Sequence, residues 1–427
     1  MTLLGDIRTT DYWSLLVKYL PHNFEILQSL DSFLVRRRNL TDIESFLRMC
    51  LIYALTDMPM QNTCVWAKEI DLMHMSPPAF FKRFCKAYNY MSQLLKEMLN
   101  EPLSNNSMIK NGINIKIIDA TCIQGPGAKG TDFRLHTAIR ADSTGYRWMI
   151  DDIHLTDEKI GETFRHFDLK PNDLVIGDRG YGNAKGVCHL TQYHANVLVR
   201  INPSGIRICN NDKQVIKLNK FEQEVRKTGC LALDYLLPIP PEKKSKRQKS
   251  WKLKDASAWL KVRIVGCRNN KGEVTWLLTT VPRQIIDDKT IAALYRIRWQ
   301  IEIEFKKLKS LANLGKLPSP NKGPSAKSWI VARLLGILLV ERINEAANLA
   351  CPPEKNEDYD TKTKKNPKQI SRWREFHLAL WTVRTMVLGN SLGIFYSFNA
   401  REGILSSRRK RRNQRCPIIP SVLNNPP

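Results

Sequence analysis

Three short runs of β-branched and apolar residues, with helix-like segments between them, constrain the fold of this chain more than any other feature. The runs are Ile115–Asp119, Asp173–Asp178 and Asn196–Ile201. Helix candidates at about Ile160–Phe167 and Ala184–His194 separate the second run from its neighbours. Strands that alternate with helices are typical of a mixed sheet with helices packed against it. The sequence therefore predicts an α/β fold.

Further strand candidates accompany this central pattern. Leu135–Arg140 and Tyr146–Asp151 are short apolar segments joined by turn-forming residues. Beyond residue 202 the rhythm changes, and Trp259–Val265 and Glu273–Thr280 have the pattern of a β-hairpin. We interpret residues 203–286 as a β-rich insertion.

Both ends of the chain have helical patterns. Ile43–Leu55 is densely apolar without glycine, and another helix is expected to begin at Pro77, with apolar residues at helical spacing as far as Met91. Towards the C-terminus, helices are expected at about Ala326–Leu349 and Trp373–Leu388. The short N-terminal helices could form a DNA-binding helix-turn-helix. A plain helical bundle is the alternative.

The charge balance points to a polyanionic partner. Lys and Arg total 67 against 41 Asp and Glu, which gives a formal net charge of +26. Such an excess favours nucleic acid, because neutralised phosphates release condensed counterions. An anionic membrane surface is a second candidate. No stretch approaches the roughly 20 apolar residues of a membrane span, and this favours nucleic acid.

The N-terminus and the cysteines predict a cytoplasmic location. The first residues lack a basic segment followed by an apolar one, which argues against a secretory signal. The ten cysteines are scattered without a Cys-x-x-Cys pair, a pattern typical of reduced thiols and not of a structural zinc site.

Two carboxylates stand at the ends of the strand-like runs. Asp119 closes the first run and Asp178 closes the second. A few converging carboxylates suffice to hold Mg²⁺, which prefers oxygen ligands and can run phosphoryl transfer on DNA. Strands also often end in Asp because this residue favours turns. The placement alone is therefore modest support for a metal site.

A third carboxylate lies on a helix expected at about Lys289–Leu311. At about 100° per residue, four polar residues fall on one stripe of this helix, whereas Glu304 faces away. The four are Tyr295, Arg298, Glu302 and Lys309. The adjoining apolar stripe consists of Leu294, Ile297, Ile301, Phe305 and Leu308. The polar stripe could present one carboxylate to metal ions and cations to phosphates. The alternative is a solvated face with ordinary ion pairs.

This spacing resembles the Tyr-Arg-Glu-Lys signature of bacterial insertion-sequence transposases of the DDE class, the insertion sequence four type. The segments Ile118–Thr121 and Thr131–His136 resemble the first-aspartate region of that family. Gly177–Gly182 resembles the second. The likeness covers most of the chain and is weakest at both ends.

The resemblance implies a cut-and-paste transposase with a ribonuclease-H-like catalytic core. Asp119, Asp178 and Glu302 would be the catalytic residues and would bind two Mg²⁺ or Mn²⁺ ions. An activated water would nick double-stranded DNA at the terminal inverted repeats of the element. The freed 3′-hydroxyl would attack the opposite strand in members that form a hairpin, and later the target DNA. The family also implies a homodimer in a synaptic complex, working at the bacterial nucleoid.

The resemblance also assigns DNA contacts. Tyr295, Arg298 and Lys309 would hold phosphates, and Trp276 would stack on an extruded base. The alternative for Trp276 is a core residue of its strand. His136 resembles a family position too, and we interpret it as structural. Basic runs at residues 243–249 and 408–412 are expected to contact the phosphate backbone, or else to be a solvated loop and tail.

These patterns predict four regions. Residues 1–110 would form a helical N-terminal DNA-binding region, and residues 111–202 and 287–325 the ribonuclease-H-like core. Residues 203–286 would be the β-rich insertion, and 326–427 a C-terminal helical region with a basic tail. One rival function is a non-catalytic DNA-binding protein derived from a transposase, against which the intact triad argues. The other is a different ribonuclease-H-like nuclease, against which the signature spacing argues.

Overall fold

The computed structural model describes the chain in two compact units, each treated by itself below. The described residues are 11–25, 42–101, 112–128, 130–141, 148–242, 251–269, 271–315, 317–318, 323–350 and 372–389. The sheet unit lies within residues 104–122 and 133–305. The helical unit lies within residues 1–103, 123–132 and 306–412.

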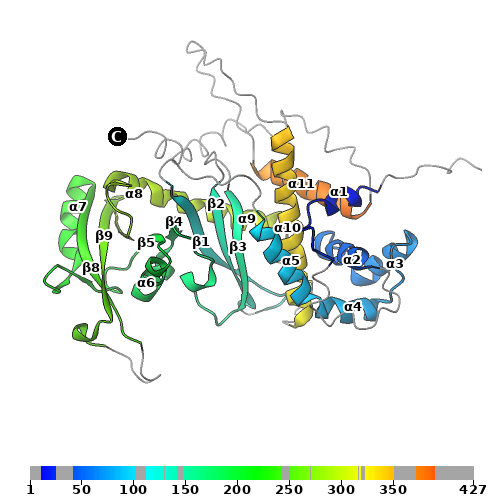
Figure 1. Cartoon of the computed structure of the whole chain (residues 1–427), viewed down its shortest axis with the longest axis horizontal. Coiled ribbons are helices and arrows are strands. Elements are labelled where there is room, and N and C mark those ends of the chain that lie inside the picture. The colour runs from blue at the N-terminus through cyan, green and yellow to red at the C-terminus, as the bar shows by residue number, and fades with distance from the viewer. Residues whose placement is uncertain are drawn as a thin grey trace, which may run out of the picture. The chain divides into compact units, whose positions relative to one another are not determined.

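The sheet unit is built on one ten-stranded mixed sheet in the order β3-β2-β1-β4-β5-β10-β9-β8-β6-β7 (Figure 1). Its strands are β1 (Asn114–Ile123), β2 (Phe133–Ala141), β3 (Trp148–Asp157), β4 (Asp173–Gly177), β5 (Asn196–Arg200), β6 (Ile208–Cys209), β7 (Val215–Ile216), β8 (Cys230–Ile239), β9 (Ala258–Arg268) and β10 (Val274–Thr279). The predicted α/β class is thus confirmed as a mixed sheet with helices.

The central strands are parallel and the outer ones antiparallel. β4 pairs in parallel with β1 and with β5. Every residue of β4 is buried, as expected for a parallel strand covered on both faces. Helix α6 (Ala184–Gln192) connects β4 to β5. β10 pairs antiparallel with β5, and the predicted hairpin of β9 and β10 is confirmed. The strands of residues 203–286 therefore extend the same sheet.

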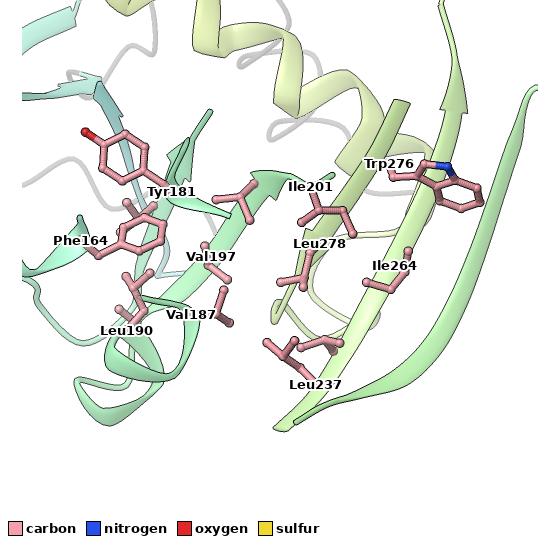
Figure 2. Close-up of a cluster of buried hydrophobic side chains, with 14 of the residues drawn as sticks. Phe164, Tyr181, Val187, Leu190, Val197, Ile201, Leu237, Ile264, Trp276 and Leu278 are labelled. Carbon is pink, nitrogen blue, oxygen red and sulfur yellow. The ribbon is translucent and has the colours of Figure 1, made fainter. Parts of the chain in front are cut away.

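The remaining helices of this unit are short. They are the 3-10 helices η3 (Phe164–His166), η4 (Arg179–Tyr181), η5 (Leu218–Phe221), η6 (Leu253–Asp255) and η7 (Arg296–Arg298), and the α-helices α7 (Glu222–Thr228) and α8 (Asp288–Tyr295). Helix α9 (Trp299–Ser310) follows η7. A continuous hydrophobic cluster fills the space between α6 and strands β5, β8, β9 and β10 (Figure 2).

The helical unit is organised around one long helix, α10 (Pro324–Ala350), which packs against four others (Figure 1). Besides α10, the described part of this unit contains the helices α1 (Trp13–Val17), α2 (Ile43–Leu55), α3 (Met60–Glu69), α4 (Pro77–Lys86), α5 (Tyr88–Asn100) and α11 (Arg372–Val387). α10 contacts α2, α4, α5 and α11. Most residues of α10 from Trp329 to Ile343 are buried. A helix that is buried on all sides carries apolar residues around its whole circumference, as α10 does.

Buried arginines link these helices. Arg333 on α10 is fully buried and donates to the carbonyl oxygens of Ala54 and Ala312, and to Asp57 Oδ1 at 2.8 Å. Arg342 donates to the carbonyl oxygens of two further segments. Hydrogen-bonding buried guanidinium groups to carbonyl oxygens offsets the cost of removing them from water.

Several predicted elements are confirmed closely, and three are corrected. Helices α2, α6, α10 and α11 lie within two residues of their predicted bounds. The predicted helix over Ile160–Phe167 is wrong, because only the 3-10 helix η3 forms there. Gly161 disfavours helix, and Thr163 Oγ1 accepts from Arg165 N at 3.3 Å at the start of η3.

The other two corrections concern helix continuity. The helix expected over Lys289–Leu311 is wrong as one element, because η7 separates α8 from α9. The helix expected from Pro77 as far as Met91 is likewise two helices, α4 and α5, joined at Ala87. Neither break contains glycine or proline, so the sequence carries no local signal for it. The basic runs at 243–249 and 408–412 lie outside the described residues.

No helix among the described residues is long and apolar enough to cross a membrane.

Candidate active site

The first two candidate carboxylates come from neighbouring parallel strands. The β1–β4 pairing runs from Asn114↔Asp173 to Ile117↔Ile176. Asp119 and Asp178 each lie two residues beyond that last pair, so the same register carries them to one edge of the sheet. One expectation needs correction here: β1 continues to Ile123, so Asp119 lies within a strand and not at its end. Asp178 does follow directly after β4.

The Asp119 carboxylate is held in a half-buried, negatively charged place. Its side chain is 16% exposed, and its Oδ1 accepts from the backbone N–H of Ala120 at 2.8 Å. Burial raises the pKa of Asp119 to about 6, and the charges of Asp178 and Glu162 add to this rise. The Ala120 hydrogen bond and Arg298 act in the opposite direction. The carboxylate thus lies where additional positive charge would stabilise it.

Asp178 is fixed by the turn that follows it. Its Oδ1 caps η4 by accepting from Gly180 N at 2.7 Å. The turn returns against β5 so closely that a Cβ at Gly182 would stand 2.6 Å from the Arg200 carbonyl oxygen. Only glycine avoids this overlap. The segment Gly177–Gly182 is therefore a rigid support for one carboxylate.

Glu302 reaches the same site through an arginine. Arg298 Nη1 donates to Asp119 Oδ2 at 3.2 Å, and Arg298 Nη2 donates to Glu302 Oε1. Arg298 lies in η7 and Glu302 in the first turn of α9. Glu304 is buried at 3% exposure and belongs to the other side of the helix. The structure therefore joins Glu302, and not Glu304, to Asp119 by way of Arg298.

The break at η7 changes the angles of the signature residues but keeps two of them stacked. In a 3-10 helix, residues three apart eclipse one another, so Tyr295 and Arg298 remain neighbours. Burial raises the pKa of Tyr295 to about 12, with Arg298 opposing and Asp178 adding to the rise. The Tyr295 hydroxyl is therefore protonated near neutral pH. The expected apolar stripe, from Leu294 to Leu308, is buried as predicted.

Two further residues were predicted to contact DNA. Lys309 is on α9, two helical turns after Glu302, and its role stays a prediction. Trp276 on β10 is 2% exposed and packs in the hydrophobic cluster with Ile264 and Leu278 (Figure 2). A ring buried in this way offers no face to a base. The alternative, a core residue of the strand, agrees with this placement, and the DNA-binding role stays a prediction.

Sequence reasoning missed two residues at this edge of the sheet. Glu162, in the segment before η3, interacts electrostatically with Asp119 and Asp178. Tyr181 is fully buried, and its hydroxyl has no hydrogen-bond partner among the described residues. Tyr181 stands within the motif Gly177–Gly182, which could have drawn attention to it. Glu162 stands in no motif.

The donor set fits a divalent cation. Carboxylate oxygens are the ligands that Mg²⁺ and Mn²⁺ prefer. The Tyr181 hydroxyl is an orphaned buried polar group beside these carboxylates, and the pKa of Asp119 is raised partly by its acidic neighbours. Within the described ranges, no three acidic, histidine or cysteine side chains lie close enough together to hold a metal ion in this arrangement. Arg298 supplies positive charge between Asp119 and Glu302.

Comparison with known sequences decides the family. The sequence profile of the transposase DDE domain matches residues 110–335, which is more than half of the chain and includes all three candidate carboxylates. The chain belongs to the transposase DDE domain family. It is therefore an enzyme that cleaves and joins DNA strands, and transposases of this family generally use divalent metal ions. The predicted transposase function is confirmed at this level.

Two bacterial proteins resemble this transposase over most of their length. One is InsL, named as a transposase for insertion sequence element IS186A in Escherichia coli (strain K12). It is 26% identical over 377 residues, which cover 80% of this chain and 96% of InsL. The transposase for insertion sequence element IS421 of Escherichia coli is 26% identical over 378 residues, with the same coverage of each chain.

Proposed function

We propose that this transposase moves an insertion sequence by cut and paste, with Asp119, Asp178 and Glu302 as the metal-binding triad of a ribonuclease-H-like core. The observation that carries the assignment is the link from Asp119 through Arg298 to Glu302. The shared strand register of Asp119 and Asp178 supports it. Both relatives are named as transposases for insertion sequence elements, which supports the same kind of substrate here.

In this proposal, Asp119, Asp178 and Glu302 would hold two Mg²⁺ or Mn²⁺ ions, and such ions would supply activation of the attacking oxygen and stabilisation of the leaving oxygen. The neighbouring side chains would bind the DNA. With Asp119 and Glu302 engaged as ligands, the Arg298 guanidinium would be free to bind a phosphate bidentately. The protonated hydroxyl of Tyr295 donates a hydrogen bond to a second phosphate oxygen. Lys309 binds the backbone further along the strand.

Double-stranded DNA would be cleaved at the terminal inverted repeats, and the freed 3′-hydroxyl would attack target DNA. The net charge of +26 supports this partner. Helix α4 in the N-terminal region 1–110 supports a contribution to DNA binding, because Lys82 and Lys86 are exposed on it and it carries no acidic residue. We further propose a homodimer that holds two element ends, working at the nucleoid in the bacterial cytoplasm.

The domain proposal follows from these roles. Residues 111–202 and 287–325 form the catalytic core, residues 203–286 an insertion that widens its sheet, and residues 326–427 a helical region with a basic tail. The antiparallel pairing of β10 with β5 supports an insertion that extends the sheet without interrupting the core.

A cleavage assay tests the proposal. Purified protein is mixed with DNA that carries the flanking inverted repeats, with and without Mg²⁺, and compared with Asp119→Ala, Glu302→Ala and Glu304→Ala. We expect metal-dependent cleavage at the repeat ends that is lost in the first two variants and retained in the third. Binding without cleavage by the parent protein contradicts the proposal. Loss of cleavage in Glu304→Ala but not in Glu302→Ala contradicts the assignment of the glutamate.

A further inference from the structure

A fourth carboxylate lies over the turn that carries Asp178. Glu162 comes from the segment between β3 and η3, and a Cβ added at Gly180 would overlap its Oε2 atom. The same Cβ would stand 3.1 Å from Oδ1 of Asp178. Both carboxylates therefore border the space directly above Gly180. A side chain at position 180 would displace one of them.

A buried hydroxyl faces the same place. Tyr181 is fully buried, yet its hydroxyl finds no hydrogen-bond partner within the described part of the chain. Its ring packs against Phe164, whereas its oxygen points away from the hydrophobic cluster (Figure 2). Burial raises the pKa of Tyr181, the charges of Glu162, Asp119 and Asp178 add to the rise, and that of Arg134 opposes it. Because a buried hydroxyl without a partner is costly, this group points to a ligand or to a carboxylate that moves when one binds.

The nearby cations do not neutralise these two carboxylates. Arg298 is engaged by Asp119 and Glu302. Arg134 lies close enough to influence Glu162 but donates to the carbonyl oxygen of Ile160 at 3.3 Å. Within the described residues, neither Glu162 nor Asp178 forms an ion pair. Two adjacent carboxylates without a counterion repel each other, and a shared cation removes that repulsion.

We propose that Glu162 is a fourth acidic residue of the catalytic centre and binds, together with Asp178, one of its divalent cations. The Tyr181 hydroxyl then donates a hydrogen bond to the metal-bound Glu162 carboxylate. This inference rests on the proposed function, because it adds a ligand to the same metal site. Glycine at position 180 leaves room for the Glu162 carboxylate, which a Cβ there would displace.

Metal binding to the full chain without DNA tests the role directly. Free Mn²⁺ is measured by electron paramagnetic resonance during titration of the wild type, Glu162→Gln, Asp119→Asn, Asp178→Asn and the matched surface control Asp157→Asn. We expect Glu162→Gln to weaken Mn²⁺ binding by about tenfold or more, comparable with the loss of a metal-site group. Asp157→Asn should bind within about twofold of the wild type, because it removes the same charge from an exposed position.

The possible results distinguish the role of Glu162 from the existence of the proposed metal site. Wild-type Mn²⁺ affinity in Glu162→Gln, with affinity lost in Asp178→Asn, overturns the role of Glu162 and leaves the proposed triad standing. Wild-type affinity in both Asp119→Asn and Asp178→Asn overturns the proposed metal site itself.

Gly180 provides a second test that depends on the same contact. Gly180→Ala should weaken Mn²⁺ binding in the wild type, because the added methyl group displaces Glu162. In a Glu162→Ala background the same change should have an effect of less than about threefold, because the displaced side chain is already absent. An equal loss in both backgrounds shows that the overlap with Glu162 is not the cause, and it overturns the proposal.

A measurement on the wild-type protein does not depend on whether the variants fold. Fe²⁺ in place of Mn²⁺, with ascorbate and peroxide, cuts the backbone close to the bound ion. We expect cuts in both the segment 160–163 and the segment 178–181. Cuts near Asp178 without any near Glu162 contradict the proposal.

Discussion

Two arginines, one in each unit, differ in how their positive charge is balanced by neighbouring groups. Arg333 in the helical unit has partners for its donors in the carbonyl oxygens of Ala54 and Ala312 and in Asp57, and it lies over the ring of Trp329. Arg298 in the sheet unit is shared between the carboxylates of Asp119 and Glu302. The donors of the first arginine are matched by acceptors. Around the second, carboxylates are in surplus.

The pKa values reflect this contrast. Burial lowers the pKa of Arg333, with only Asp57 acting against it. Burial also disfavours the charged form of Arg298, but its hydrogen bond to Glu302 and the nearby negative groups raise its pKa overall. Structural polar groups are satisfied in the folded chain. Groups that await a ligand are left with unbalanced charge, which is typical of functional sites.

The largest expected effect comes from removing one surplus carboxylate. Asp119→Asn or Asp178→Asn should reduce single-turnover DNA cleavage on the order of 10³-fold, because the metal ions lose a ligand. The free energy of unfolding, measured by urea denaturation without metal, should stay within about 1 kcal/mol or rise, because a repulsion is relieved. If either variant cleaved DNA within tenfold of the wild-type rate, the excess carboxylates at Arg298 would not be needed for catalysis.

The matched arginine of the helical unit should behave in the opposite way. Arg333→Met leaves two buried carbonyl oxygens without donors and is expected to lower the free energy of unfolding by about 3 kcal/mol. Arg374→Met is the control on the exposed side of α11, with an expected change within about 0.5 kcal/mol. Equal small effects in urea denaturation would show that Arg333 is not structural.

The arginine of the site should matter for activity and little for stability. Arg298→Gln is expected to reduce cleavage by about 10²-fold, because a charged phosphate contact is lost. Its Mn²⁺ affinity without DNA should equal or exceed that of the wild type, since the competing cation is gone. Arg296→Gln, an exposed neighbour in η7, should leave both quantities within about threefold. Weaker Mn²⁺ binding in Arg298→Gln would contradict the exchange of arginine for metal.

The smallest effect concerns His136, a buried histidine of the sheet unit on which no carboxylate among the described residues acts. Burial lowers the pKa of His136 to about 4, and the neighbouring His166, Arg134 and His154 act in the same direction. The unfolded chain therefore takes up this proton first as the pH falls, and stability is lost between about pH 6.5 and pH 4.

The loss attributable to His136 is on the order of 2 kcal/mol. The wild type minus His136→Gln difference in unfolding free energy, measured across that range, should shrink by this amount as the pH falls. A difference that is constant with pH would show that His136 does not titrate in this way.

The sequence predicted what local patterns determine. The apolar runs placed β4 and β5, and the length and periodicity of the helices placed α2, α10 and α11 within two residues. Asp178 was assigned mainly from the family resemblance, with its place after an apolar run as modest support, and it does directly follow the buried strand β4. For Glu302, the four-residue spacing selected the side of the helix that contacts Arg298, although the helix itself contains the 3-10 turn η7. The catalytic roles of both residues stay predictions.

What the sequence could not predict depends on contacts between distant segments. β1 continues beyond Asp119 because its pairing, and not its local composition, sets its length. Glu162 belongs to no motif and meets Asp178 only through the path of the chain after β3. In the sequence, Tyr181 has the pattern of an ordinary core aromatic residue. Only the structure shows that its hydroxyl has no hydrogen-bond partner among the described residues. The burial of Trp276 likewise depends on the whole cluster around β10.

The central claim is that Asp119, Asp178 and Glu302 hold the catalytic cations. Anomalous diffraction from a crystal of this protein grown with Mn²⁺ tests it most directly. We expect two anomalous peaks bounded by these carboxylates, with Arg298 moved away from Asp119. Saturating Mn²⁺ that gives peaks only elsewhere, with Arg298 still between Asp119 and Glu302, would contradict it.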